Sequence, residues 1–309
     1  MKANRSFRAQ DEAGAETIGA LILFGIFVAV IAVMNVTAVP AAGLAAEETH
    51  HARVVEALGA LQAEAEAAGL PGNVGATVGR ALALGPEQDA GGDFMSFFLA
   101  TPARATGQLS FTPHYGSITL SHTRAAPPGT VYDIGSATAG FPLGRITFDP
   151  HPVFRAPGTV QLENGGLVLA SEAGETMRFA PPVTVSVAGG TTHVTVKARA
   201  LNGTDADVGG TAPVRVALQT EAATLNAPVS NNADQVVLKL ETGHGPAWGA
   251  FLNETSTTGG LSAGQFTTHV SMGTASGGLD AVTWTVLGTG SGNDVRLSSG
   301  IAVYGVKVS

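Results

Sequence analysis

The sequence contains no cysteine and few charged residues. Without cysteine, no disulfide framework can stabilise the fold, and no thiolate can act as a nucleophile or metal ligand. Charged residues make up only 13% of the 309 residues, and 24 acidic against 16 basic residues give a formal net charge of −8. Because no basic stripe is present to neutralise phosphates, we expect no nucleic-acid partner.

The sequence also lacks the common signatures of catalysis and of cofactor binding. It has no G-x-S-x-G elbow, no phosphate-binding lysine loop and no H-E-x-x-H helix. We therefore predict no enzyme and no cofactor. Paired carboxylates contributed by distant strands leave no local signature, so a catalytic ectodomain stays as the third-ranked function.

Scattered histidines and one acidic pair give no metal site. His50 and His51 are adjacent, so on a helix their side chains point about 100° apart and cannot bind one ion together. We expect the eight histidines to be surface or capping residues. Asp205 and Asp207 resemble the start of a calcium loop, but the third ligand and the distal glutamate are missing, so a hairpin turn is the better interpretation.

One long apolar run, residues 18–39, carries no charge and is followed by Pro40. As a helix, its 22 residues would reach about 33 Å at 1.5 Å per residue, enough to cross a hydrocarbon core of about 30 Å. Lys2, Arg5 and Arg8 precede the run, and no comparable basic cluster follows it. The positive-inside bias therefore predicts a single-pass protein of the cell membrane, with residues 1–17 in the cytoplasm and the C-terminal part extracellular.

The residues before the apolar run resemble the leader of archaeal type IV pilin-like proteins with class III signal peptides. The match consists of Arg8 and Ala9 followed by Gln10, Asp11 and Glu12. The resemblance implies that a prepilin-type peptidase cleaves between Ala9 and Gln10 and that the apolar helix stays in the mature chain. The alternative is an uncleaved single-span anchor.

After Pro40 the pattern predicts a second helix over residues 40–70, which we expect to form an extracellular stalk. Pro40 either kinks one long helix or starts the second one. Apolar positions with spacings of seven, three and four form a stripe, and Gly69 and Pro71 end the segment. The stripe has two interpretations, namely contact between subunits or packing on the protein's own strands. Its members are Leu44, His51, Val54, Leu58, Leu61, Ala65 and Ala68.

From Gly107 onward, alternation with a period of two predicts strands. Asn164-Gly165 and Gly189-Gly190 separate alternating segments and predict two hairpins. We expect an α+β fold, in which the N-terminal helix is followed by one or two antiparallel β-sandwich-like modules. An Asn- and Pro-rich break at residues 226–232 suggests a first module over 71–225 and a second over 226–309. Within the second, Pro246 starts a short helix whose Trp248 and Leu252 reach the core.

Several other positions carry functional expectations. Asn202 and Asn253 are possible glycosylation sites in predicted loops. Gly19 and Gly25 would let neighbouring helices pack closely, as small residues do within membranes.

Segments such as Thr112-Pro113-His114-Tyr115 extend the pilin-like resemblance over most of the chain. Together these patterns favour a non-catalytic pilin-like or membrane-anchored surface protein that acts by assembly or adhesion, as a homo-oligomer or with other pilin-like subunits. The alternative is an anchored extracellular module that binds carbohydrate or protein.

Overall fold

The computed structural model describes residues 4–86, 105–123, 143–224, 227–288 and 295–309, with side chains from Thr17 onward outside 227–232. Two helices and fifteen strands make up this part of the chain, with one short 3₁₀ turn, η3 (Ser276–Gly278). Their bounds are α1 (Asn4–Ala68), β1 (Thr77–Ala83), β2 (Thr106–Thr123), β3 (Leu143–His151), β4 (Gly158–Glu163), β5 (Gly166–Ser171), β6 (Gly174–Phe179), β7 (Val183–Ala188), β8 (Thr191–Asn202), β9 (Ala206–Gly210), β10 (Pro213–Ala223), β11 (Ala227–Ala233), β12 (Gln235–Thr242), α2 (Gly245–Thr258), β13 (Phe266–Ser271), β14 (Asp280–Leu287) and β15 (Val295–Val308).

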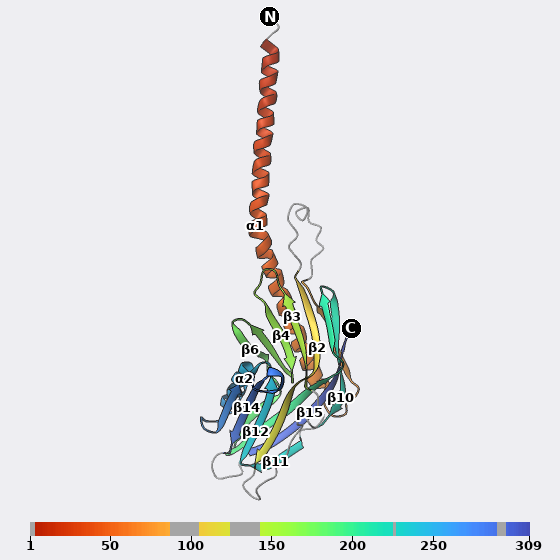
Figure 1. The fold of residues 1–309 in the computed structure, drawn as a ribbon, viewed down its shortest axis with the longest axis vertical. Helices are drawn as coiled ribbons and strands as arrows, with labels where there is room; N and C mark the ends of the chain where they lie inside the picture. Colours follow the sequence, from red (N-terminus) through yellow and green to blue (C-terminus); the bar gives the residue numbers. More distant parts are fainter. Residues whose placement is uncertain (1–3, 87–104, 124–142, 225–226, 289–294) are drawn as a thin grey trace.

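The two predicted N-terminal helices are one. Helix α1 runs without interruption from Asn4 to Ala68 and contains Pro40. It ends where the glycine and proline after Ala68 predict: the Gly69 N–H still donates to the Ala65 carbonyl at 2.7 Å, but Pro71 has no N–H with which to continue the helix. Figure 1 shows the helix projecting far beyond the strands, with only its C-terminal part lying against them.

The strands form two curled sheets. The first has six strands in the order β1-β10-β15-β8-β7, with β11 also paired to β15. The second has nine, in the order β13-β14-β12-β2-β3-β4-β5-β6, with β9 also paired to β2. Among the described strands, β8 and β15 form the single parallel pair. The expected class, a long helix followed by a mostly antiparallel β region, is confirmed at this level.

The sheets do not divide at residue 226, where the sequence suggests a boundary between modules. Strand β12 pairs with β2, and β15 lies between β10 and β8, so both sheets take strands from either side of that position. The segment expected as a break instead forms β11, whose pairing with β15 has two register shifts. Such irregular pairing suits a segment that contains proline, which cannot donate to a strand ladder.

The buried side chains gather in two hydrophobic clusters. One contains Leu58 and Leu61 of α1 together with residues of β1–β4, β10 and the end of β15. The other contains Trp248 and Leu252 of α2, as the sequence predicts, with residues of β7, β8, β12 and β14. The long strand β2 serves both clusters, because its first half contributes Phe111 to one and its second half contributes Leu120 to the other.

Both predicted hairpins are present. Asn164 and Gly165 have φ of 45° and 74° between β4 and β5, and Gly189 and Gly190 have φ of 58° and 80° between β7 and β8. Positive φ at both central residues is the requirement of the two-residue turn that matches strand twist. The predicted hairpin at Asp205 is wrong, since the chain leaves β8 for the other sheet and β9 pairs with β2.

Candidate functional site: the helical spine and the polar cluster beside α2

The N-terminal part of α1 is exposed. The side chains of residues 17–30 are all exposed, and Leu23 is 72% exposed. In the described part of the chain, α1 is the one helix long and apolar enough to cross a membrane, and its position suits an anchor or a signal sequence. A Cβ added at Gly19 or Gly25 would have no neighbour within 4 Å, so nothing within the chain requires glycine there.

The C-terminal part of α1 is buried by the protein's own sheets. Val54, Leu58 and Leu61 join the first hydrophobic cluster, which agrees with the second of the two interpretations of the apolar stripe. Polar contacts add to the packing, because the Tyr304 hydroxyl donates to the Ala65 carbonyl over 2.6 Å. The Gln62 amide also donates to the Gly165 and Ala180 carbonyls. These contacts fix residues 54–65 rigidly against the strands.

Glu47 marks the point where α1 leaves the sheets. Its buried carboxylate accepts backbone hydrogen bonds from Val153 at 2.7 Å, Phe154 at 3.0 Å and Arg155 at 2.8 Å, all in the segment between β3 and β4. Hydrogen bonds to a charged acceptor are stronger than neutral ones. The Glu47 side chain thus turns inward and satisfies three backbone N–H groups of a connection.

Three histidines are also more buried than the sequence suggests. His50, His122 and His244 are buried, so the prediction of surface or capping positions is wrong for His50 and His122, whereas His244 is the N-cap residue of α2. His50 Nε2 lies 2.9 Å from the Ala83 carbonyl oxygen, which ties α1 to β1.

Burial, aided by the positive charges of Arg155 and of His50 when it is protonated, lowers the pKa of His51 from 6.5 to about 4.

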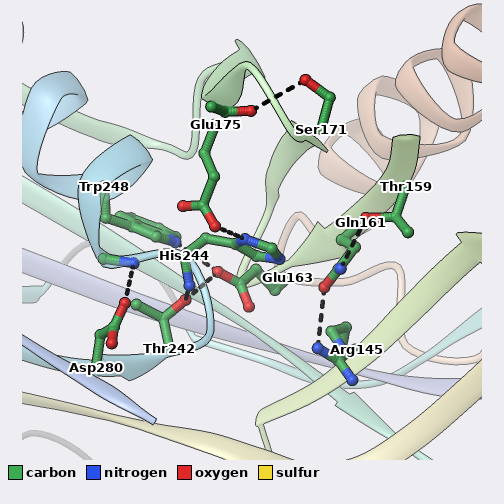
Figure 2. Close-up of polar contacts among 12 residues, drawn as sticks. Arg145, Thr159, Gln161, Glu163, Ser171, Glu175, Thr242, His244, Trp248 and Asp280 are labelled. Carbon is green, nitrogen blue, oxygen red and sulfur yellow. Dashed lines mark hydrogen bonds and ion pairs between the residues drawn. The ribbon is translucent and has the colours of Figure 1, made fainter. Parts of the chain in front are cut away.

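A cluster of polar side chains surrounds the N-terminus of α2, as Figure 2 shows. Asp280 accepts hydrogen bonds from the backbone N–H groups of Gly245 at 3.0 Å and Gly273 at 2.8 Å. The buried carboxylate of Glu163 accepts from Trp248 Nε1 at 2.6 Å and from the Thr242 hydroxyl. Negative side chains are favourable at a helix N-terminus, where the backbone carries partial positive charge. The cluster therefore holds the start of α2 between β4, β12 and β14.

The same cluster contains the group most like a catalytic base. His244 Nδ1 lies 3.0 Å from Glu175 Oε1, and among the described residues Nε2 has no hydrogen-bond partner. That arrangement orients a histidine in many hydrolases, but catalysis also needs a substrate within reach of the free nitrogen. Nε2 is buried, and no described residue sits against it as a nucleophile. The geometry therefore supports anchoring of α2 rather than proton transfer.

A groove of about 650 Å³ opens beside α2, between β6, β7 and the helix, and shares Glu175 with the polar cluster. Met177, Val185 and Phe251 supply apolar lining, while Glu175, Arg178 and Glu254 supply charge. Strands β6 and β7 are the outer strands of their sheets, so the groove lies beside two sheet edges. The volume of the groove is within the range of ligand sites, and its lining residues do not indicate a particular ligand.

The remaining predicted positions are dispersed over the molecule. Arg8, Ala9, Gln10 and Glu12 lie in α1, in the part where only the backbone is described. Asn202 is the last residue of β8, and its amide donates to Glu221 over 3.0 Å. Asn253 is exposed but lies inside α2, so its predicted loop is wrong. The described residues contain no group of three or more metal-binding side chains.

The sequence could not identify the Glu47 clamp or the cluster at α2. Glu163, Glu175, His244 and Asp280 come from different elements, and no fixed spacing connects them. Compared with models of known protein families, with curated proteins and with solved structures, the chain gives no match.

Proposed function

We propose that this protein is a non-catalytic, membrane-anchored surface subunit of the pilin-like kind, which assembles through its N-terminal helix and displays the β region outside the cell. One observation carries the proposal. A single continuous helix is uncovered and apolar over residues 18–30, yet is buried in the protein's own sheets over residues 54–65. Because the buried part attaches α1 rigidly to the sheets, the uncovered part projects away from them.

The uncovered part needs an apolar environment. A helix that is apolar on all sides is stable in a membrane or inside an assembly, and not in water. Membrane anchoring and helical assembly both supply that environment, and in pilin-like proteins we expect them to follow one another. Cleavage after Ala9 by a prepilin-type peptidase would leave this helix intact, because the cut precedes the apolar residues.

Gly25→Leu tests assembly. A Cβ added here has no neighbour within 4 Å beyond the local helix backbone, and leucine makes the span more apolar, so folding and membrane insertion should be unchanged. If neighbouring helices approach closely at Gly25, the larger side chain separates them. Crosslinking of whole cells should give a ladder of multimers with the parent protein and with a Val30→Leu control, and monomer alone with Gly25→Leu.

The opposite results are equally clear. A ladder that survives Gly25→Leu, or no ladder in the parent, contradicts assembly through this face and leaves a monomeric surface anchor. N-terminal sequencing of membrane-extracted protein tests processing separately. A mature chain that begins at Gln10 supports the pilin-like proposal, whereas one that begins at Met1 supports the uncleaved anchor.

The groove beside α2 supports a second candidate, an anchored module that binds an extended protein segment. The two strands end their sheets, so each has an edge without a neighbouring strand among the described ones, although the Val187 N–H of β7 donates to the Gly259 carbonyl. Strand addition to a sheet edge is a common way to bind peptides. Ala250 is exposed and lines the groove, so Ala250→Trp should fill it and reduce attachment of cells to protein-coated surfaces. Thr257→Trp, exposed on the same helix and not part of the groove lining, is the control. Equal attachment by both variants and the parent contradicts this candidate.

A further inference from the structure

We propose that residues 151–157, from the last residue of β3 to the residue before β4, rest in the lipid headgroup layer as a second membrane contact, beside the spanning helix. The proposal depends on the membrane anchoring proposed above and adds a defined surface of the β region that meets lipid. Residues 151–157 read His-Pro-Val-Phe-Arg-Ala-Pro.

The length of the uncharged part of α1 sets the position of this segment. Residues 17–46 carry no charged side chain, and Glu16 and Glu47 flank them. As a continuous helix they extend about 45 Å at 1.5 Å per residue, which equals the thickness of a bilayer with its headgroups, about 40–45 Å. Glu47 therefore lies at the outer limit of the headgroup layer when the uncharged part fills the membrane.

Two contacts place residues 151–157 at that level. The Glu47 carboxylate holds the backbone of Val153, Phe154 and Arg155. The Phe154 ring lies on the bare backbone of Gly43, where an added Cβ would come within 2.3 Å of Phe154 Cε2. Gly43 is one helical turn, about 6 Å, closer to the membrane centre than Glu47. The ring therefore sits inside the headgroup layer rather than above it.

The chemistry of the segment suits a lipid surface. Val153 is 46% exposed, which is costly in water but favourable in the interfacial region. The segment carries Arg155 and His151 and no acidic residue, and cytoplasmic or extracellular anionic lipids attract such groups. Figure 1 shows β3 and β4 beside the point where α1 emerges, at the end of the sheets that faces the uncovered helix.

The absence of cysteine allows a clean test with single-cysteine variants of the full chain. A polarity-sensitive fluorophore is attached at Val153→Cys, Val30→Cys or Met272→Cys, and each protein is reconstituted into vesicles of zwitterionic and anionic phospholipid. Quenchers are lipids with a nitroxide either on the headgroup or deep on the acyl chain. Emission of the buried residues Trp248 and Trp284 verifies folding of each labelled protein.

The three positions give different expectations. The probe at Val30, within the span, loses most of its fluorescence to the deep quencher. The probe at Val153 is quenched strongly by the headgroup nitroxide, weakly by the deep one, and is blue-shifted relative to Met272. Met272 follows β13, and its 63% exposed side chain should respond to neither quencher.

The outcomes separate the two proposals. Quenching at Val30 with a Val153 probe that behaves like Met272 overturns the second membrane contact and leaves the anchor in place. No quenching at Val30 overturns membrane anchoring, and the headgroup contact with it. Headgroup quenching at Val153 that disappears on Glu47→Ala, while Val30 remains quenched, supports the clamp as the device that positions the segment.

Discussion

The two ends of α1 differ in how their apolar residues are arranged and therefore in what covers them. Between residues 18 and 30 apolar side chains point in every direction and remain exposed, whereas between residues 54 and 65 they form a stripe that the sheets bury. An apolar stripe is typical of a helix that packs on the surface of a folded domain, whereas a helix that is apolar on all sides is typical of a membrane span or the interior of an assembly. One helix thus joins two environments without a break in its backbone.

Glu47 lies between these two parts. On its N-terminal side, the described side chains of α1 are exposed or partly exposed, and on its C-terminal side α1 contributes residues to the first cluster from Val54 to Ala65. The carboxylate clamp on residues 153–155 is the first polar attachment after the uncharged part. The predictions below compare substitutions in the buried part with matched substitutions elsewhere on the helix.

The largest difference is expected for a leucine in each part. Leu58 is fully buried, so Leu58→Ala should lower the free energy of unfolding of the β region by about 2–5 kcal/mol, through lost burial and the cavity that remains. Leu23→Ala should change it by less than about 0.5 kcal/mol, because the Leu23 side chain is 72% exposed. Denaturant unfolding of the protein in nanodiscs, followed by tryptophan emission, measures both. Equal losses in the free energy of unfolding would mean that the uncovered part of α1 stabilises the β region as much as the buried part does.

Glu47→Gln should have the next largest effect. An amide keeps one acceptor oxygen but loses the charge that strengthens three backbone hydrogen bonds, so we expect a loss of about 1–3 kcal/mol. Glu48→Gln is the matched control, since Glu48 is exposed and adjacent. Hydrogen exchange of the amides of residues 153–155 gives a local measure. Unchanged protection in Glu47→Gln would contradict the clamp.

Tyr304→Phe should have a smaller effect. It removes one hydroxyl that donates to the Ala65 carbonyl of α1, so we expect a loss of about 1 kcal/mol. Thr49→Val is the control, because its hydroxyl bonds only within the helix, to the Ala45 carbonyl, and its loss leaves packing on the sheets unchanged. If Thr49→Val destabilises the protein as much as Tyr304→Phe, the bond between strand and helix has no special role.

Features determined by local chemistry were predictable from the sequence. The two-residue turns at Asn164-Gly165 and Gly189-Gly190, the proline at the start of α2 and the end of α1 at Gly69 each follow from the backbone preferences of one or two residues. The apolar run likewise predicts a helix by its length alone.

Features determined by distant pairing were not predictable. A break at residue 226 appears natural in the sequence, yet β12 and β15 return to strands formed far earlier in the chain. Glu47 and Glu48 are indistinguishable in a one-dimensional pattern, and only the fold shows that Glu47 has backbone N–H groups to satisfy. The cluster around Glu163 requires four elements to meet before it exists.

The smallest effect at neutral pH is expected for His51, and it grows as the pH falls. Burial, helped by Arg155 and His50, lowers the pKa of His51 to about 4 in the folded protein, against 6.5 when unfolded. The unfolded chain therefore binds the proton first, so stability is complete above pH 6.5, falls between pH 6.5 and 4, and loses nothing further from this group below pH 4. His51→Gln should remove that share of the pH dependence while leaving stability at pH 7.5 nearly unchanged. Unfolding midpoints of parent and variant at pH 7.5, 5.5 and 4.5 measure it, and other titrating groups cancel in the difference. Parallel curves would show that His51 titrates alike in both states and that α1 is not closely packed at the turn after Glu47.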